Sequence, residues 1–344
     1  MKLSRIIRDG PDGPQVRTVA VIPTDEVVID LRVAERRRLE RSGASPDAAL
    51  RIASAVFPGS LTAAIASGKT FTHQVISALD ERDEEALVPF SEVRWAAPVD
   101  PPVMLDASAF EQHLVNAHAR GKRPMPDLFY EVPVYYKMNS VKIFGHEHTV
   151  PWPGDARFMD YELELAVVIG SSGADLTPEE AATHIFGLTV MNDFSARDVQ
   201  AREMTAGFGP AKGKDFGTAL GPWITTIDEL DVADLTMVAR VNGEEWSRGS
   251  TSTLTWSLQE VVAYASRNEV VVPGQVIGSG TVGLGSGLEL YRKLSPGDVV
   301  ELEIGGIGTL RNRLAEPSET RWDPTPKERK AQVTLPSREA PGAN

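Results

Sequence analysis

The hydrophobic pattern is most distinctive in residues 160–170, where a run of β-branched and aliphatic side chains ends at a glycine. Such a run predicts a strand, in which side chains two positions apart lie on the same face. Glu162 and Glu164 therefore share one face, and both faces become apolar toward Ile169. Two neighbouring buried carboxylates are costly unless they are neutralised. Either a bound cation neutralises this pair, or the strand lies at a sheet edge and turns its acidic face to solvent.

Two further acidic residues extend this pattern. Asp193 ends a second strand-like run, residues 185–193, where an acid at the strand end can point into a pocket. Asp106 is the other candidate. Oxygen ligands alone, in a chain without cysteine, favour a hard divalent ion such as Mg²⁺ or Ca²⁺ over zinc or a softer metal. The predicted ligands are Asp106, Glu162, Glu164 and Asp193.

Along the chain the pattern indicates three regions. Residues 1–97 mix short strands with helical stretches, one of which begins at Ser45 as its N-cap. A proline-rich linker beginning at Pro98 leads into residues 98–315, where short strands and Gly/Pro turns predict a β-rich fold. Residues 316–344 are rich in proline, serine and charge, so we expect a tail that hangs free or wraps a neighbouring subunit.

A formal charge of −13 and the absence of cysteine narrow the classes of function. An acidic chain is poorly suited to nucleic acid or anionic membrane as its main partner. Without cysteine, neither disulfides nor thiolate chemistry contributes. No apolar run approaches the length of a membrane span, and residues 1–10 lack the apolar centre of a signal peptide. We therefore expect a soluble cytoplasmic protein, in which an anionic substrate needs local lysine or arginine side chains.

A glycine-rich segment, residues 278–283, fits the dinucleotide-binding pattern G-x-G-x-x-G. That motif requires a strand, a turn and a helix in this order. Residues 284–287 are poor helix formers, so we do not expect nucleotide binding. We expect instead a loop whose backbone approaches a ligand, with the Thr281 hydroxyl as a donor.

Residues 195–198 have the S-x-x-D form of a capping box and predict the start of a helix. On such a helix Arg197 and Gln200, three residues apart, share a face. That face lies either on the protein surface or toward the metal pocket that follows Asp193.

Several blocks taken together resemble the fumarylacetoacetate hydrolase superfamily. They are Glu162-Leu163-Glu164, residues 191–200, residues 213–218, the spacing of seven from Asp106 to His113, and the late segments 280–281 and 288–289. Their joint order is far more specific than any one block, and they span more than half the chain. The resemblance implies an α+β, β-rich fold: a mixed β-sandwich roll catalytic domain with a small N-terminal α/β domain. It also implies a homodimer.

The resemblance implies roles for individual side chains as well. The catalytic set would be a general base, the acid that orients it and three residues that face an oxyanion: His113, Glu289, Lys214, Arg197 and Gln200. The substrate-binding set would be Tyr136, Lys122 and Thr281. Lys122 stands where fumarylacetoacetate hydrolases have an arginine for the distal carboxylate of the substrate, and Arg120 or Arg123 could take that role instead.

The expected activity is hydrolysis of a carbon–carbon bond in an acylpyruvate or related 1,3-diketo acid, dependent on Mg²⁺, Ca²⁺ or Mn²⁺, in the catabolism of aromatic compounds. Superfamily members also isomerise, decarboxylate, tautomerise or hydrate 2-oxo acids through the same enolate, so an isomerase or decarboxylase is the alternative. His113 favours hydrolysis, because that reaction needs an activated water. A non-catalytic metal-binding scaffold is a third possibility, against which His113 and Lys214 argue.

Overall fold

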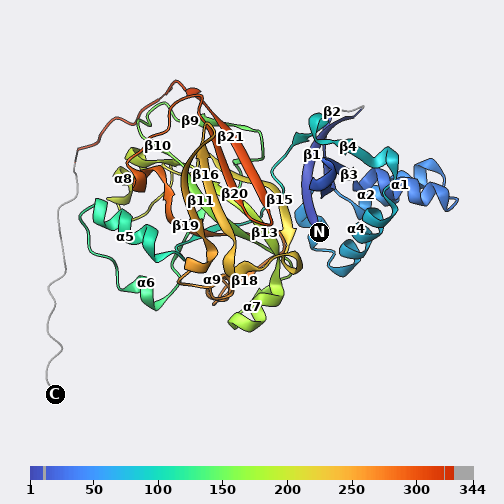
Figure 1. The fold of residues 1–344 in the computed structure, drawn as a ribbon, viewed down its shortest axis with the longest axis horizontal. Coiled ribbons are helices and arrows are strands. Elements are labelled where there is room, and N and C mark those ends of the chain that lie inside the picture. The colour runs from blue at the N-terminus through green and yellow to red at the C-terminus, as the bar shows by residue number, and fades with distance from the viewer. Residues whose placement is uncertain (11–12, 321, 329–344) are drawn as a thin grey trace, which may run out of the picture.

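The computed structural model describes residues 1–10, 13–320 and 322–328. One long sheet joins the N-terminal strands β1–β4 to strands of the rest of the chain, and Figure 1 shows these two groups of strands side by side. In order across this sheet the strands are β4 (Leu87–Pro89), β3 (Val27–Asp30), β2 (Gly13–Ile22), β1 (Lys2–Gly10), β15 (Thr218–Thr226), β13 (Ile185–Asp193), β11 (Glu162–Ile169), β19 (Val276–Ser286), β6 (Met104–Ala107) and β7 (Tyr135–Met138), with β5 (Arg94–Trp95) beside β1 and β8 (Ile143–Phe144) beside β15.

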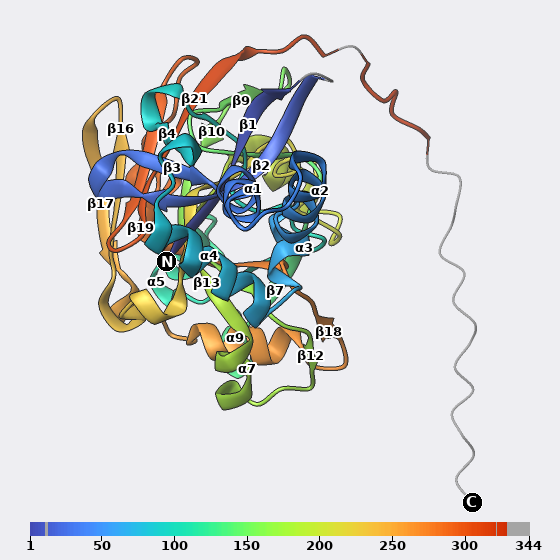
Figure 2. The same ribbon diagram turned by 90° about the vertical axis from the view of Figure 1, so that its right-hand side faces the viewer.

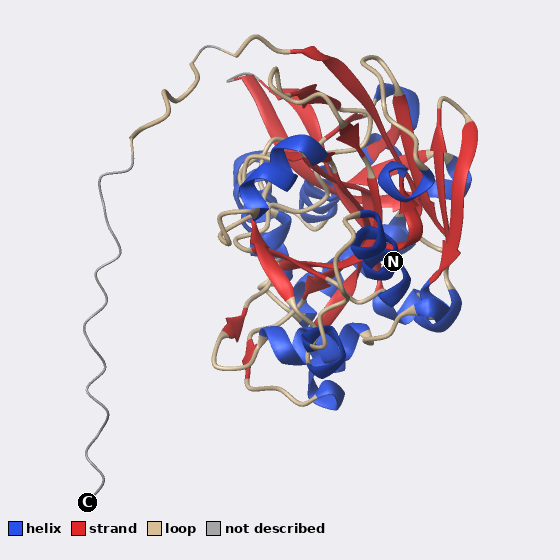
Figure 3. Ribbon diagram, turned by 90° about the vertical axis from the view of Figure 1, so that its left-hand side faces the viewer, coloured by secondary structure: helices blue, strands red, loops and turns tan. Residues whose placement is uncertain are grey.

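A second sheet packs against the first, and two short strand pairs complete the β structure. The second sheet has the order β17 (Glu244–Ser250), β16 (Thr236–Val241), β20 (Val299–Ile304), β21 (Gly308–Pro317) and β9 (Thr149–Trp152). The short pairs are β10 (Met159–Asp160) with β14 (Ser195–Ala196), and β12 (Gly173–Ala174) with β18 (Val270–Val271). Figure 3 shows the strands at the centre and helices around them, which confirms the predicted α+β, β-rich class.

The helices lie outside the strands. They are α1 (Leu31–Arg41), α2 (Pro46–Val56), α3 (Leu61–Ile65), α4 (Lys69–Glu81), α5 (Glu111–Arg120), α6 (Leu128–Glu131), α7 (Pro178–His184), α8 (Arg197–Met204), α9 (Leu258–Ala265) and α10 (Gly287–Leu290). The predicted cap of α2 is confirmed, because the Ser45 hydroxyl accepts from the backbone N–H of Ala48. Among the described residues, no helix combines the length and apolarity needed to cross a membrane.

Strand β11 is buried along its whole length between β13 and β19, so the edge-strand interpretation of its acidic face is wrong. Its two faces enter different cores. Leu163 and Leu165 pack into the core between the two sheets, whereas Ala166 and Val168 pack toward the N-terminal helices. Figure 2 shows those helices grouped beside β1–β4. The alternation predicted from the sequence is therefore present.

The N-terminal residues join the main sheet through β1, which pairs with β15 at Leu3 and Ile224. The division into residues 1–97 and 98–315 stays a prediction. Residues 321 and 329–344 of the predicted tail lie outside the described residues. At the start of the tail, the backbone N–H of Ser318 donates to the carbonyl of Trp152. The expected homodimer and cytoplasmic location also stay predictions.

Candidate active site

Three buried carboxylates from neighbouring strands meet at one place in the long sheet. Asp106 lies on β6, Glu164 on β11 and Asp193 at the end of β13. Their carboxylate oxygens can all be chosen within 4.8 Å of one another. Asp106 is 6% exposed, and Glu164 and Asp193 are fully buried. The structure thus brings together three of the four predicted ligands.

The electrostatics of this acidic cluster favour a cation. Burial and the neighbouring Asp193 raise the pKa of Asp106 to about 8, and burial with Asp106 raises the pKa of Glu164 well above its ordinary value. One oxygen of Glu164 (Oε2) and one of Asp193 (Oδ1) have no hydrogen-bond partner among the described residues. Buried polar atoms are rarely left unpaired. These oxygen donors fit a hard divalent ion such as Mg²⁺, Mn²⁺ or Ca²⁺.

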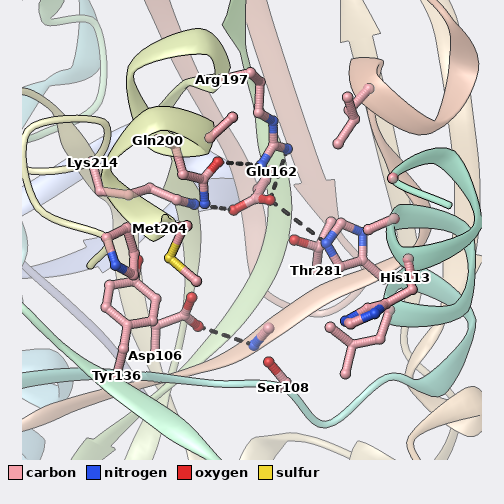
Figure 4. A pocket seen from close by; sticks show the side chains of 18 of the residues that line it. Asp106, Ser108, His113, Tyr136, Glu162, Arg197, Gln200, Met204, Lys214 and Thr281 are labelled. Atoms are coloured by element: carbon pink, nitrogen blue, oxygen red, sulfur yellow. Dashed lines mark hydrogen bonds and ion pairs between the residues drawn. The ribbon is translucent and has the colours of Figure 1, made fainter. Parts of the chain in front are cut away.

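Glu162, the fourth predicted ligand, is held by two basic side chains. Lys214 contacts the carboxylates of both Glu162 and Asp193, and Nη2 of Arg197 lies 2.8 Å from Oε1 of Glu162 (Figure 4). Burial opposes ionisation of Glu162, but Arg197 and Lys214 outweigh it and hold the pKa of this carboxyl below its usual range. Glu162 and Lys214 are therefore both charged, and Glu162 lies outside the three-carboxylate cluster.

His113 and Glu289 form the pair that the family resemblance implied. Nδ1 of His113, on α5, lies 2.8 Å from Oε2 of Glu289, on α10. Glu289 also accepts from the Asn116 side chain and the backbone N–H of Leu284, which fix its carboxylate. The other ring nitrogen, Nε2, lies 3.7 Å from Glu162. His113 thus has one nitrogen bound to an acid and the other directed toward the acidic pocket.

Helix α8 presents Arg197 and Gln200 on one face, with Nη1 of Arg197 3.2 Å from Oε1 of Gln200, and both side chains line the pocket. The capping box predicted for this helix is wrong. The cap residue is Ala196, the Ser195 hydroxyl donates to the carbonyl of Asp193, and Asp198 accepts from the 157–158 backbone. Tertiary contacts to that neighbouring loop take the place of the local cap.

The glycine-rich segment predicted as a loop is strand β19, which pairs with both β11 and β6. Its glycines let the backbone pass close to the acidic cluster. A Cβ placed at Gly278 would lie 2.6 Å from Oδ1 of Asp106 and 2.9 Å from Oε2 of Glu164. The expected hydroxyl donor is present, because Oγ1 of Thr281 donates to Oε1 of Glu164 at 3.2 Å.

Gly278→Ala is therefore expected to weaken Mn²⁺ binding at least tenfold and to lower the free energy of unfolding by about 1–3 kcal/mol, the usual cost of overpacking. Calorimetric titration with Mn²⁺ and denaturant unfolding would measure both. Gly305→Ala is the matched control, since its added Cβ meets no atom closer than 3.6 Å. Unchanged Mn²⁺ affinity in Gly278→Ala would show that the glycine is not needed for the site.

Most of the site residues line one cavity of about 550 Å³: Asp106, His113, Glu162, Glu164, Arg197, Gln200, Lys214 and Thr281. Asp193 and Glu289 contact these residues but do not line the cavity. Tyr136 is in its wall and donates its hydroxyl to Oδ2 of Asp193 at 2.6 Å, so it contacts the acidic cluster directly. Lys122 does not line the cavity. The backbone at Lys122 has a positive φ of 51° just after α5, and Arg120 and Arg123 line the cavity instead. A substrate-binding role for Lys122 stays a prediction, and the position of the two arginines favours the alternative that they take this role.

The family model described as fumarylacetoacetate (FAA) hydrolase C-terminal matches residues 103–315 of the chain. The chain belongs to the fumarylacetoacetate hydrolase family. The resemblance seen in the sequence is thereby confirmed. Oxaloacetate tautomerase YisK from Bacillus subtilis (strain 168) is 30% identical over 308 residues, which cover 86% of this chain and 95% of that protein.

Solved structures of the fumarylacetoacetate hydrolase family agree with the fold. A fumarylacetoacetate hydrolase from the psychrophile Exiguobacterium antarcticum has a TM-score of 0.67 at 26% identity, covering 92% of this chain and 99% of that one. A 5-carboxymethyl-2-hydroxymuconate delta-isomerase from Mycobacterium smegmatis has a TM-score of 0.62 at 27% identity, with the same coverage. The family is thus one of enzymes, and the names of these relatives include a hydrolase, an isomerase and a tautomerase.

The sequence analysis missed one buried acid that contacts a residue of the candidate active site. Asp160 is fully buried, and its Oδ2 accepts from Nε of Arg197 at 2.8 Å. Its position next to Tyr161, at the start of the acidic strand, could have drawn attention to it. Asn116, one helical turn after His113, was missed as well, although the i, i+3 spacing places both on one face of α5.

Proposed function

We propose that this chain is a divalent-cation-dependent hydrolase that cleaves a carbon–carbon bond in a small acylpyruvate or related 1,3-diketo acid. The observation that carries the proposal is the His113–Glu289 pair, which faces the acidic cluster across one cavity. Hydrolysis needs a base that takes a proton from water. An imidazole held by a carboxylate on one nitrogen has the other nitrogen available for that proton.

Asp106, Glu164 and Asp193 are the proposed cation ligands, with Glu162 as the fourth residue of the same pocket. When bound, a divalent cation would supply Lewis acidity to adjacent oxygens of a 2-oxo acid and stabilise an enolate. Tyr136 and Thr281 each donate to one of these acids, so they would fix the carboxylates and leave their other oxygens for the ion.

The reaction steps follow from the positions of the remaining side chains. His113 takes a proton from water at Nε2, and the hydroxide adds to the acyl carbonyl. Arg197, Gln200 and Lys214 line the same cavity, and Figure 4 shows Gln200 and Lys214 across from His113. We propose that the N–H groups of the three side chains stabilise the oxyanion. The bond between the acyl carbon and the methylene carbon then breaks, which gives a carboxylic acid and an enolate. Protonation of the enolate carbon by His113 yields pyruvate and restores the base.

Tautomerisation of a 2-oxo acid is the second candidate. It is favoured by the relative named oxaloacetate tautomerase, which matches 86% of this chain. The same base would then move a proton between carbon and oxygen without adding water. The two proposals predict different products from the same site.

A product assay distinguishes them. The protein, loaded with Mn²⁺, is incubated with acetylpyruvate and separately with freshly dissolved enol-oxaloacetate, and products are followed by NMR. Hydrolysis predicts acetate and pyruvate in equal amounts from acetylpyruvate. Rapid loss of enol-oxaloacetate without any acetate from acetylpyruvate would replace the hydrolase proposal with the tautomerase.

The outer part of the cavity, between α5 and α8, would hold the acyl group of the substrate. The residues that line the cavity include Leu114, Met204 and Arg123, and Arg123 has no ion-pair partner among the described residues. Arg120 is already engaged, because it donates to the carbonyl of Leu288 and stacks on Tyr291. Apolar walls with one uncommitted arginine suit short acyl groups and give moderate preference for a second carboxylate.

Arg123→Ala is expected to lower kcat/KM for fumarylpyruvate relative to acetylpyruvate about tenfold, the value of one charged hydrogen bond. Lys122→Ala is expected to change that ratio less than twofold, because Lys122 does not line the cavity. Steady-state kinetics on both substrates measure this. A native preference for fumarylpyruvate above about a thousandfold, roughly 4 kcal/mol, would contradict this description of the outer cavity.

A further inference from the structure

Asp160 connects two parts of the candidate active site that come from distant segments of the chain. It lies on β10, which pairs with β14 directly before α8. Its Oδ2 accepts from Nε of Arg197 at 2.8 Å, lies 2.7 Å from Nη2 of the same side chain, and accepts from the backbone N–H of Leu288 at 3.0 Å. The remaining oxygen accepts from the backbone N–H of Tyr161 at 3.0 Å.

The two ends of this link carry different functions. Arg197 reaches Glu162 and Gln200, on the side where an oxyanion is expected. Leu288 directly precedes Glu289, which holds Nδ1 of His113. One buried carboxylate therefore bonds both to Arg197 and to the backbone directly before Glu289, the acid of the histidine pair.

The site around Asp160 is shaped to hold that carboxylate in one place. Asp160 is fully buried, and a Cβ placed at Gly287 would lie 2.6 Å from its Oδ1. Glu162 already pairs with the guanidinium of Arg197, so Asp160 is not its only counter-ion. A residue that served only as a counter-ion for Arg197 would also not need a bond from the Leu288 N–H. The bond to Leu288 is the contact that a simple counter-ion does not explain.

We infer that Asp160 is a positioning residue that fixes Arg197 and the His113–Glu289 pair relative to each other. Asp160 does not line the cavity and is not one of the three clustered carboxylates. It would act through Arg197 and the Leu288 backbone. The consequence for kinetics rests on the proposed function. The effect on the geometry of His113 does not rest on the proposed function, so the inference and the proposed function can be tested separately.

The test compares Asp160→Asn with Asp198→Asn. In the native protein the Asp198 carboxylate accepts from the backbone at Arg157 and Phe158, and among the described residues it makes no hydrogen bond to the Arg197 guanidinium, His113 or Glu289. Protein labelled with ¹⁵N at histidine and arginine is examined by NMR, with His113→Ala used to assign the imidazole signals. We expect Asp160→Asn to shift both the His113 ring nitrogens and Nε of Arg197, and Asp198→Asn to shift neither. A shift at Arg197 without one at His113 would overturn the inference and leave Asp160 as a counter-ion.

Two further measurements extend the comparison of Asp160→Asn with Asp198→Asn. Calorimetry is expected to give the same Mn²⁺ affinity within threefold for both variants, while kcat on the best substrate falls at least tenfold in Asp160→Asn alone. An unchanged kcat would also overturn the inference. If Asp160→Asn does not fold, hydrogen exchange of the native protein decides. The Leu288 amide should exchange at least a hundredfold more slowly than the amide of Phe208, a 96% exposed residue, and equal rates would exclude the link.

Discussion

Removal of divalent cations with EDTA is expected to abolish turnover, and added Mg²⁺ or Mn²⁺ is expected to restore it. The reason is the cluster of Asp106, Glu164 and Asp193, whose buried oxygens lie within 4.8 Å of one another. Burial raises the pKa of all three carboxyl groups, and neighbouring carboxylates raise each pKa further, so a bound cation would favour their charged forms. Full activity in rigorously metal-free protein would exclude the proposed mechanism.

Glu164→Ala is expected to cause the same loss of activity without unfolding the protein. The variant removes a buried carboxylate that has one unpaired oxygen, so the metal-free protein should keep its stability or gain slightly. In the native protein, Mn²⁺ at a hundred times its dissociation constant should raise the free energy of unfolding by about 2.7 kcal/mol. Thermal unfolding with and without Mn²⁺ should show this increase for the native chain and none for Glu164→Ala.

Glu303→Ala provides the control for that comparison. Glu303 lies on β20 of the second sheet, is 42% exposed and pairs with Arg240 at the surface. An exposed ion pair contributes little to stability. The variant should therefore keep both activity and the Mn²⁺-induced stabilisation. A similar loss in Glu303→Ala would mean that the effect of Glu164→Ala is not specific to the acidic cluster.

The elements that the sequence predicted well are those whose structure is determined by their own side chains. Strands β11 and β13 are mostly apolar apart from their acidic positions, and such runs are buried in the centre of a sheet. Helix α2 begins with Ser45 before Pro46, which is a local start signal. In each case hydrophobic burial and local hydrogen bonding favour the same structure.

The elements that it did not predict depend on distant partners. Glycine has low strand propensity, yet residues 276–286 form β19 because β11 and β6 supply hydrogen bonds on both sides. Likewise, Asp198 bonds to the backbone of residues 157–158 in place of capping α8. No local pattern could reveal either pairing, since the partners are tens of residues away.

The candidate site follows the same division. Glu162, Glu164 and Asp193 were found from their residue type and their positions in apolar runs, whereas His113 was found only through the family resemblance. The pairing of Glu162 with Lys214 and Arg197 was not found, because it is made in three dimensions. Which basic side chain of residues 120–123 faces the cavity was not predictable either, because it depends on the backbone after α5, where Lys122 has a positive φ and Arg123 lines the cavity.

His113→Ala is expected to lower kcat for hydrolysis by roughly 10²–10⁴-fold, the usual contribution of a general base. Mn²⁺ affinity should stay within threefold of the native value, because His113 is not one of the clustered carboxylate ligands. Glu289→Gln should cause a smaller loss, since it leaves the imidazole in place but removes the charge that holds Nδ1. Steady-state kinetics and calorimetric titration with Mn²⁺ measure these effects.

His184→Ala is the control, because His184 lies on α7, bonds to Ser171 and does not line the cavity. It should retain full activity. The comparison also separates the two candidate reactions. Hydrolysis requires a proton to be taken from water, so loss of the imidazole must remove acetate formation from acetylpyruvate. If His113→Ala still produces acetate at the native rate, His113 is not the base. If the variant keeps only rapid loss of enol-oxaloacetate, that tautomerisation uses another group, and Lys214, which is buried beside Glu162 and Asp193, is the next residue to replace.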